Sequence, residues 1–310
     1  LVKLVYTVTG TDRSDVENIS GVSVTNVDSL DAADIDNILS SGMSIAVYDT
    51  INNRIAHTWS RNDAGESSFT EYNYDSDGKL VYTVSGASRA AVEGLTAVTT
   101  GNVRSLSESQ VNSYLSAGMS IAVYDANYER VNHVWSSDEN DIISFTKYHY
   151  NSAGTLIYTI SGNTRSQVEN VTGISESNVM SLSGSSISSI LDTGMSLAVY
   201  DTEDNRIDHV WSLDDGGDPN FTKYHYDSIG KLVFTVSGSS RSQVENLSGV
   251  NVTNVSSLDA SDIDNYLSSG MSIAVYDTVN NRVDHVWARD DSGKATFTEY
   301  NYDNLGKLVY

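Results

Sequence analysis

The hexapeptide Lys79-Leu80-Val81-Tyr82-Thr83-Val84 repeats residues 3–8 without a change. Related segments begin at Thr155, Lys231 and Lys307, so the copies start 79 − 3, 155 − 79, 231 − 155 and 307 − 231 residues apart, which is 76 each time. Self-similarity at a fixed period is the signature of a tandem-repeat architecture. The sequence therefore predicts four gapless units, 3–78, 79–154, 155–230 and 231–306, followed at 307–310 by the first strand of a further repeat.

Each unit is predicted to hold four strands and one helix. In the first unit, alternating residues indicate strands at 3–8, 43–48, 54–59 and 69–74, with the second and third joined as a hairpin. In the second unit, the capping box of Ser107 and Gln110 indicates a helix after the opening strand, and Gly118 is expected to cap its end. The expected fold class is a β-rich α+β tandem repeat of β-α-β-β-β units, with a hairpin across every boundary.

An arginine and a glutamate four residues apart precede the predicted helix in every unit. The spacing favours a single helical turn that carries an ion pair, which contributes a few tenths of a kcal/mol. The pairs are Arg13/Glu17, Arg89/Glu93, Arg165/Glu169 and Arg241/Glu245.

Four sheet-forming units can stack as an open array or close into a four-bladed, propeller-like ring. A closed ring shares one strand across its join. This chain instead has an opening strand at Lys3–Val8 and the start of the same strand again at Lys307–Tyr310. We therefore expect an open array, cut from a longer one, with the closed ring as the alternative.

The boundary between units carries the motif Tyr72-Asn73-Tyr74-Asp75-Ser76-Asp77-Gly78-Lys79-Leu80. Equivalent motifs begin at Tyr148, Tyr224 and Tyr300, and Asn151 replaces the aspartate in the first of these. The motif resembles the YD motif of Rhs-type repeats, which occur in bacterial surface and secreted proteins. The resemblance covers this motif alone in each unit. It implies a compact, tyrosine-stacked hairpin in an exported protein.

Acidic residues outnumber basic ones by 41 to 18, which gives a formal net charge of −23. Such a surface repels phosphate backbones and anionic lipid, so nucleic-acid partners and electrostatic docking on membranes are excluded. No apolar run approaches the roughly 20 residues of a membrane-spanning helix, and we expect no membrane insertion. The absence of cysteine excludes disulfides, thiolate metal sites and thiol nucleophiles.

A variable acidic loop follows the predicted hairpin in each unit. Ca²⁺ binds oxygen-rich loops, so calcium is the candidate cofactor, although no loop follows the EF-hand pattern. The alternative is a solvated turn without a ligand. The candidate calcium ligands are Asp63, Glu66, Asp138, Asp141, Asp214, Asp215, Asp218, Asp290 and Asp291.

A histidine lies two residues before each of the four tryptophans in the chain. Zinc needs three or four ligands that converge on one point, and copies one unit apart do not converge. We therefore expect the histidines to pack in the core beside the tryptophans. The pairs are His57/Trp59, His133/Trp135, His209/Trp211 and His285/Trp287.

No unit carries an insertion or a set of unique acid–base and nucleophilic residues, so the chain is not expected to be an enzyme. The gapless period and the Ser/Thr/Asn/Asp-rich surface favour a structural protein of the cell exterior. We expect it to build a filament, sheath or adhesin stalk by self-association, with strand edges as the contacts. The alternative is a repeat-based binding module for calcium or glycans.

Overall fold

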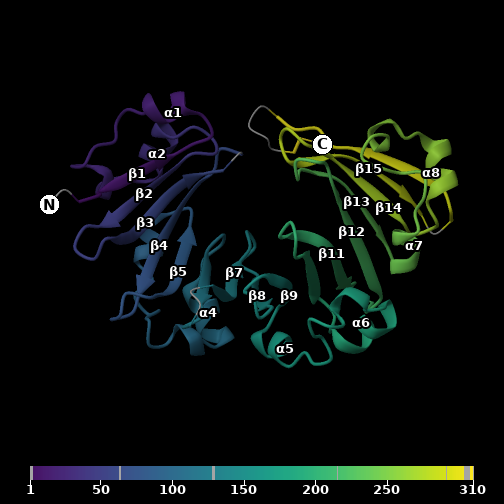
Figure 1. The fold of residues 1–310 in the computed structure, drawn as a ribbon, viewed down its shortest axis with the longest axis horizontal. Coiled ribbons are helices and arrows are strands. Elements are labelled where there is room, and N and C mark those ends of the chain that lie inside the picture. Colours follow the sequence, from purple (N-terminus) through teal and green to yellow (C-terminus); the bar gives the residue numbers. More distant parts are fainter. Residues whose placement is uncertain are drawn as a thin grey trace. The chain divides into compact units, whose positions relative to one another are not determined.

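The computed structural model describes residues 3–62, 64–127, 130–214, 216–290, 292–303 and 308–309 (Figure 1). Within these ranges the strands form a single sheet of sixteen, and their order in the sheet follows the sequence from β1 to β16. Each repeat contributes four consecutive strands to this sheet. Since β1 and β16 stand at the two ends of this order, the sheet is open, which confirms the predicted open array over the closed ring.

Equivalent elements recur in four sets along the chain. The opening strands are β1 (Tyr6–Thr9), β5 (Leu80–Gly86), β9 (Leu156–Gly162) and β13 (Leu232–Gly238). The second strands are β2 (Ser44–Asp49), β6 (Ser120–Tyr124), β10 (Ser196–Asp201) and β14 (Ser272–Asp277). The third strands are β3 (Arg54–Arg61), β7 (Val131–Ser137), β11 (Arg206–Leu213) and β15 (Arg282–Arg289). The fourth strands are β4 (Ser67–Tyr74), β8 (Ile143–Tyr150), β12 (Pro219–Tyr226) and β16 (Ala295–Glu299).

Three short helices separate the first strand of each set from the second, where the sequence predicts a turn and one helix. The first helices are α1 (Arg13–Glu17), α3 (Arg89–Glu93), α5 (Arg165–Glu169) and α7 (Arg241–Glu245). The 3₁₀ helices are η1 (Val27–Ser29), η2 (Val103–Ser105), η3 (Val179–Ser181) and η4 (Val255–Ser257). The second α-helices are α2 (Ala32–Ile38), α4 (Glu108–Tyr114), α6 (Gly184–Ile190) and α8 (Ala260–Tyr266).

The expectation of one helix per unit is therefore wrong. The arginine–glutamate turn is itself a five-residue α-helix, and the ion pair of Arg89 and Glu93 measures 2.7 Å. The predicted glycine cap is also wrong: α4 ends at Tyr114, its C-cap Leu115 is extended, and Gly118 takes its positive φ in the following turn. The capping box of Ser107 and Gln110 is present as predicted.

Apart from its four repeats, the chain divides into two compact halves, residues 1–146 and 147–310. Within the second, α6 and α7 pack against β12 and α8 against β15, and Figure 1 shows these helices on one face of the strands. Where each 76-residue repeat begins and ends stays a prediction. No helix of the described residues has the length and apolar content needed to cross a membrane.

The core lies between the helices and the sheet. Its largest buried side chains are an aromatic pair in successive strands: Trp59 of β3 and Phe69 of β4 are both 0% exposed and meet edge to face at 4.9 Å. The predicted histidine lies beside them, because the His57 ring is 5.1 Å from Phe69 and buried. The packing of histidine beside tryptophan in the core is thus confirmed for the first three pairs, whereas Trp287 of the fourth pair is only partly buried.

Candidate functional site: an uncovered repeat junction

The junction between two successive repeats is built around a phenylalanine of the fourth strand. In the register of β4 with β5, Phe69 lies opposite Gly86 and Thr70 opposite Ser85, whose hydroxyl oxygens are 2.8 Å apart. A Cβ on Gly86 would come within 3.0 Å of Met119 Cγ, so glycine permits the close packing there. The β12–β13 junction repeats this register, with Phe221 opposite Gly238.

An arginine of the following repeat covers this phenylalanine. The Arg89 guanidinium lies 5.3 Å from the Phe69 ring and donates a 2.6 Å hydrogen bond to the carbonyl oxygen of Asp28 in the preceding repeat. Its ion pair with Glu93 holds the side chain in place. A guanidinium can satisfy these partners together because its five N–H groups diverge in one plane, and its cationic face is attracted to the ring.

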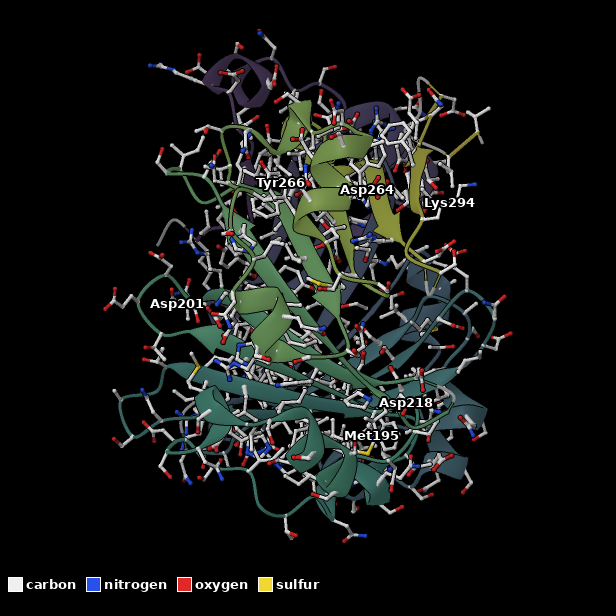
Figure 2. The ribbon with its side chains drawn as sticks, turned by 90° about the vertical axis from the view of Figure 1, so that its right-hand side faces the viewer. Met195, Asp201, Asp218, Asp264, Tyr266 and Lys294 are labelled. Carbon is white, nitrogen blue, oxygen red and sulfur yellow. The ribbon has the colours of Figure 1, made fainter. Side chains whose placement is uncertain are left out.

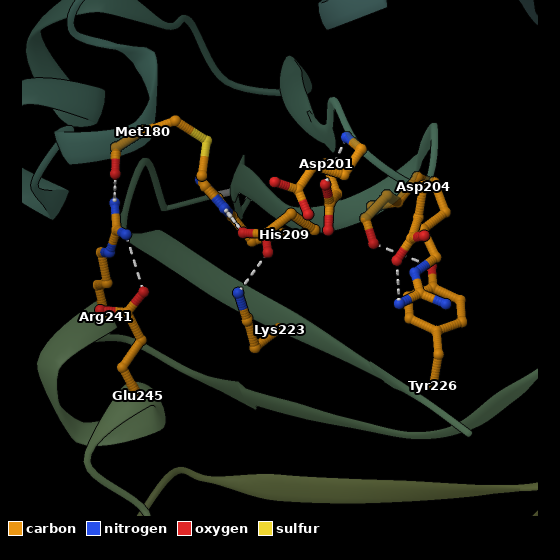
Figure 3. Close-up of polar contacts among 12 residues, drawn as sticks. Met180, Asp201, Asp204, His209, Lys223, Tyr226, Arg241 and Glu245 are labelled. Carbon is orange, nitrogen blue, oxygen red and sulfur yellow. Dashed lines mark hydrogen bonds and ion pairs between the residues drawn. The ribbon is translucent and has the colours of Figure 1, made fainter. Parts of the chain in front are cut away.

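The same arrangement recurs in residues 147–310 (Figure 3). Arg241 donates to the carbonyl oxygen of Met180 at 2.6 Å, pairs with Glu245 at 2.8 Å and lies 5.6 Å from the Phe221 ring. Only 21% of the Arg241 side chain is exposed. One guanidinium therefore links two repeats at each of these junctions.

At β16 the junction lacks its second half. Phe297 is 50% exposed, whereas the equivalent Phe69, Phe145 and Phe221 are all 0% exposed. Among the described residues, β16 pairs with β15 on one side, and no strand pairs with it on the other. Beyond the end of β16, Tyr302 forms an isolated bridge with Leu308, and the N–H of Val309 donates to the carbonyl oxygen of Asn301. The edge of β16 from Ala295 to Glu299 therefore presents unpaired backbone groups next to an exposed aromatic ring.

At β1 the other half of a junction stands alone. The Arg13 side chain is 87% exposed and pairs with Glu17, in contrast to Arg241 at 21%. Helix α1 buries no residue, whereas α7 buries Val244. The edge of β1 that does not face β2 is likewise without a partner strand in the described part of the chain. In the described residues, β16 has no following strand and helix to cover its phenylalanine, and β1 with α1 has no preceding strand to cover.

The acidic loops form tight hairpin turns. In the second, Asp138 Oδ1 accepts hydrogen bonds from the backbone N–H of Asn140 and Ile142, at 2.8 and 2.9 Å. Asp141 adopts a positive φ of 61°, a conformation that its glycine counterparts Gly65, Gly217 and Gly293 also adopt and that aspartate tolerates. These two candidate ligands therefore have a structural role in the turn.

The equivalent loops use the same acceptor. Asp214 Oδ1 accepts from the backbone N–H of Asp218 at 2.9 Å, and Asp290 Oδ1 accepts from that of Lys294 at 2.8 Å. In the first loop Asn62 Oδ1 accepts from the N–H of Glu66. Figure 2 shows Asp218 and Lys294 on the side of residues 147–310 away from Asp201, which ends β10.

No group of three or more His, Asp or Glu side chains that could hold a metal ion occurs within the described residues. Three of the candidate ligands, Asp63, Asp215 and Asp291, lie outside those residues. Calcium binding by these loops stays a prediction.

The tyrosine-rich motif also has a structural role. The hydroxyl of Tyr74 donates to the carbonyl oxygen of Ile55 at 2.8 Å, and the Arg54 guanidinium lies 4.2 Å from its ring. Asp75 Oδ1 accepts the backbone N–H of Lys79 at 2.9 Å, which closes the turn. Asn151 replaces this aspartate without loss, because its amide oxygen accepts the N–H of Thr155 at the same distance.

Buried titratable groups add a local electrostatic network beside the β12 junction. Burial opposes ionisation of Asp208, but hydrogen bonds from His209 (2.6 Å) and Lys223 (2.5 Å) lower its pKa to about 2. Figure 3 shows Lys223 directed at the same cluster.

A second perturbed group lies in β8. Burial, and next the charge of Lys147, lower the pKa of His149 to about 4.

Sequence reasoning identified the arginine–glutamate pair but missed its contact with the preceding repeat. The i,i+4 spacing describes only the local helix, whereas the Arg241 contact reaches a carbonyl 61 residues away. One signal was available: the position is arginine in all four units, and never lysine. Arginine is favoured where several directed hydrogen bonds and a ring contact are made at once.

Comparison with known proteins leaves the family open. No family model matches the sequence, and no curated protein matches it. The crystal structures of TcdB2-TccC3-TEV and of TcdB2-TccC3 without its hypervariable C-terminal region are similar to this chain at 12% and 13% identity, with TM-scores of 0.25 and 0.26. The similarity covers 88% and 87% of this chain but 11% of each of those chains, so this chain spans a small part of their length.

Proposed function

We propose that this chain is a non-catalytic structural repeat protein that self-associates through the uncovered end of its sheet. In that role it is a building block of an extracellular filament, sheath or adhesin stalk. The observation that carries the proposal is Phe297, which is 50% exposed where its three equivalents are fully buried. The buried equivalents differ from Phe297 in one feature: a following strand and helix cover their rings.

Two physical effects favour association at this end. Unpaired N–H and C=O groups of an edge strand are a template for another strand. Covering a half-exposed phenylalanine contributes further, because complete burial of such a side chain is worth about 1.5–3 kcal/mol. The net charge of −23 opposes association. This repulsion is screened beyond about 8–10 Å at ordinary ionic strength, so association is expected to strengthen as the salt concentration rises.

The extracellular setting rests on the sequence. The chain has no cysteine, a strongly acidic surface and the tyrosine-rich motif that resembles those of exported Rhs-type repeats. An acidic, polar surface keeps repeat proteins soluble along their sides, so association is directed to the ends.

Sedimentation velocity over a wide range of protein concentration tests the proposal. The wild-type chain is expected to form dimers and longer species as concentration rises, and electron micrographs are expected to show fibres. Phe297→Ser should shift the distribution to monomer. Val279→Ser is the matched control, because Val279 is also apolar and is 82% exposed, but in the loop between β14 and β15. A wild-type monomer at every concentration contradicts the proposal.

A further inference from the structure

A pocket of about 330 Å³ lies within residues 147–310, where β8 and β9 meet α5 and the loop that follows it. Ligand pockets have volumes of about 300–1,000 Å³, so this one fits a small molecule. We propose that it binds a carboxylic acid whose apolar body is a single ring. The proposal does not depend on self-association, because no residue of β1 or β16 lines the pocket.

The walls of the pocket suit an apolar ring. Ile160 of β9 and Val168 of α5 are buried, at 2% and 3% exposure. Val171 and Ile174, in the loop after α5, line the pocket and are half-buried. Ligand pockets typically combine such apolar walls with a few polar groups that fix the orientation of the ligand.

The size of one wall residue distinguishes this repeat from the other three. Position 171 is valine, which is one methylene smaller than isoleucine or leucine. The residues at the equivalent positions of the other repeats are Ile19, Leu95 and Leu247. Val171 therefore leaves space that each of these larger side chains would occupy.

A buried hydroxyl lines this space. Tyr158 is only 7% exposed, and its hydroxyl has no hydrogen-bond partner among the described residues. In the second repeat, by contrast, the equivalent Tyr82 donates to the carbonyl oxygen of Val98 at 2.9 Å. Val98 is buried, whereas its counterpart Ile174 is half-buried. Because buried polar groups are normally hydrogen-bonded, the Tyr158 hydroxyl points to a ligand that supplies the missing partner.

The charged groups of the pocket favour a carboxylate. The His149 ring stacks on Tyr158 with centroids 4.3 Å apart, and its low pKa, caused by burial and next by the charge of Lys147, keeps it neutral at neutral pH. Lys147 is therefore the cation beside these rings. The carboxylate in the lining, Glu169, already pairs with Arg165 at 2.9 Å. An incoming carboxylate thus meets two donors, the ammonium group and the phenol.

The rival ligand is a cation held by Glu169. The net charge of −23 attracts cations to the chain and repels anions, so it favours this rival. Benzoate, benzyl alcohol and benzylammonium share one ring and differ in charge, and their comparison separates the two ligand classes.

NMR titration of the full chain with benzoate tests the proposal, at neutral pH and about 0.15 M salt to screen the net charge. Benzoate is expected to bind with a Kd of about 1 mM, as is typical of so small a ligand. Binding should shift the ring-proton signals of His149, which are assigned by their loss in His149→Asn. Benzyl alcohol and benzylammonium are expected to bind at least about tenfold more weakly, because neither accepts a charged hydrogen bond from Lys147.

Two variants copy the fourth repeat and so introduce side chains that the fold already accommodates. Val171→Leu introduces the counterpart of Leu247 and is expected to abolish the benzoate shifts, because the added methylene fills the pocket. Tyr158→Phe introduces the counterpart of Phe234 and is expected to weaken binding about two- to tenfold, through loss of one neutral hydrogen bond. Lys147→Gln is expected to weaken it about tenfold or more. Urea unfolding of each variant checks that the fold is retained.

Three outcomes overturn the proposal. If benzoate binds Val171→Leu as tightly as the wild-type chain, the ligand lies elsewhere. If benzylammonium binds more tightly than benzoate, or Lys147→Gln leaves benzoate binding unchanged, the pocket does not select a carboxylate. If the wild-type chain shows no saturable shift up to about 10 mM benzoate, the pocket does not bind this class of ligand. The oligomeric state of the chain is measured separately and bears on self-association alone.

Discussion

The junction around Phe221 and the end around Phe297 contain equivalent residues in different environments. Phe221 is fully buried beneath β13 and Arg241, whereas Phe297 is 50% exposed at the edge of the sheet. The surrounding unit is nearly the same in both cases, with the tryptophan ring 4.7 Å from Phe221 and 4.6 Å from Phe297. A repeat of this protein is therefore not a complete folding unit. Its last core position is filled by the repeat that follows.

The largest expected contrast is between Phe221→Ala and Phe297→Ala. Removing the buried ring is expected to lower the free energy of unfolding by about 3–5 kcal/mol, the usual cost of a large cavity. At the exposed ring, about 1 kcal/mol is expected, because part of its surface is already in water. Urea unfolding at a concentration where the chain sediments as a monomer measures both. Equal losses would show that Phe297 is covered in solution.

A smaller contrast is expected between Arg241→Ala and Arg13→Ala. The first leaves the Met180 carbonyl without its charged donor and uncovers Phe221, for an expected loss of about 1.5–3 kcal/mol. The second removes an exposed pair with Glu17, for which about 0.3–0.5 kcal/mol is expected. Thermal or urea unfolding of the monomer again provides the measurement. A loss for Arg13→Ala as large as for Arg241→Ala contradicts the comparison.

The features predicted from sequence are those that depend on neighbours along the chain. The 76-residue period gave the strand order, and Ser107 with Gln110 marked a helix start that is present. The 3₁₀ helices were missed because a single turn has no periodic pattern. The contact of Arg89 with Asp28 was missed because it joins residues 61 positions apart through the path of the chain between repeats. The exposure of Phe297 was also missed, because the repeated sequence alone predicts the same environment for all four equivalent phenylalanines.

Acid is expected to distinguish the junctions further, because His149 and His225 occupy the place that Asn73 and Asn301 hold at the others. Burial lowers the pKa of His149 to about 4 and also lowers that of His225. An unfolded histidine has a pKa of about 6.5, so between about pH 6.5 and 4 the unfolded chain binds more protons. The contribution of these two neutral, buried histidines to stability is complete above about pH 6.5. It is lost as the pH falls toward about 4, because the unfolded chain binds protons that the buried rings do not.

Urea unfolding across this pH range tests the histidine effect. The double variant His149→Asn, His225→Asn is expected to lose less stability on acidification than the wild-type chain, since asparagine does not titrate. The carboxylates titrate equally in both proteins and so cancel in the comparison. Parallel pH profiles of the two proteins would assign the acid sensitivity to other groups.

The smallest expected effect is that of salt and calcium on the melting temperature. Raising sodium chloride from about 0.01 M to about 0.15 M shortens the Debye length from about 30 Å to about 8 Å and is expected to stabilise a chain of net charge −23. If the acidic loops bind calcium, millimolar Ca²⁺ adds a further rise over EDTA at matched ionic strength. Asp138→Asn keeps the turn acceptor while removing a charge, so it separates loss of binding from loss of the turn. Equal midpoints with and without Ca²⁺ would leave only screening.

The sequential strand order has a consequence for how the protein acquires its structure. Every pairing joins strands that are close along the chain; the residues paired between the first and second strands of a repeat, such as Tyr6 and Val47, are at most 47 − 6 = 41 positions apart in the strand registers. Low contact order of this kind reduces the entropy of loop closure before native contacts form and is associated with fast folding. Each strand pairs with the strand that precedes it along the chain, so its partner is already present when the chain is synthesised from the N-terminus. Folding can therefore proceed vectorially, strand by strand, with each newly formed edge as the template for the next.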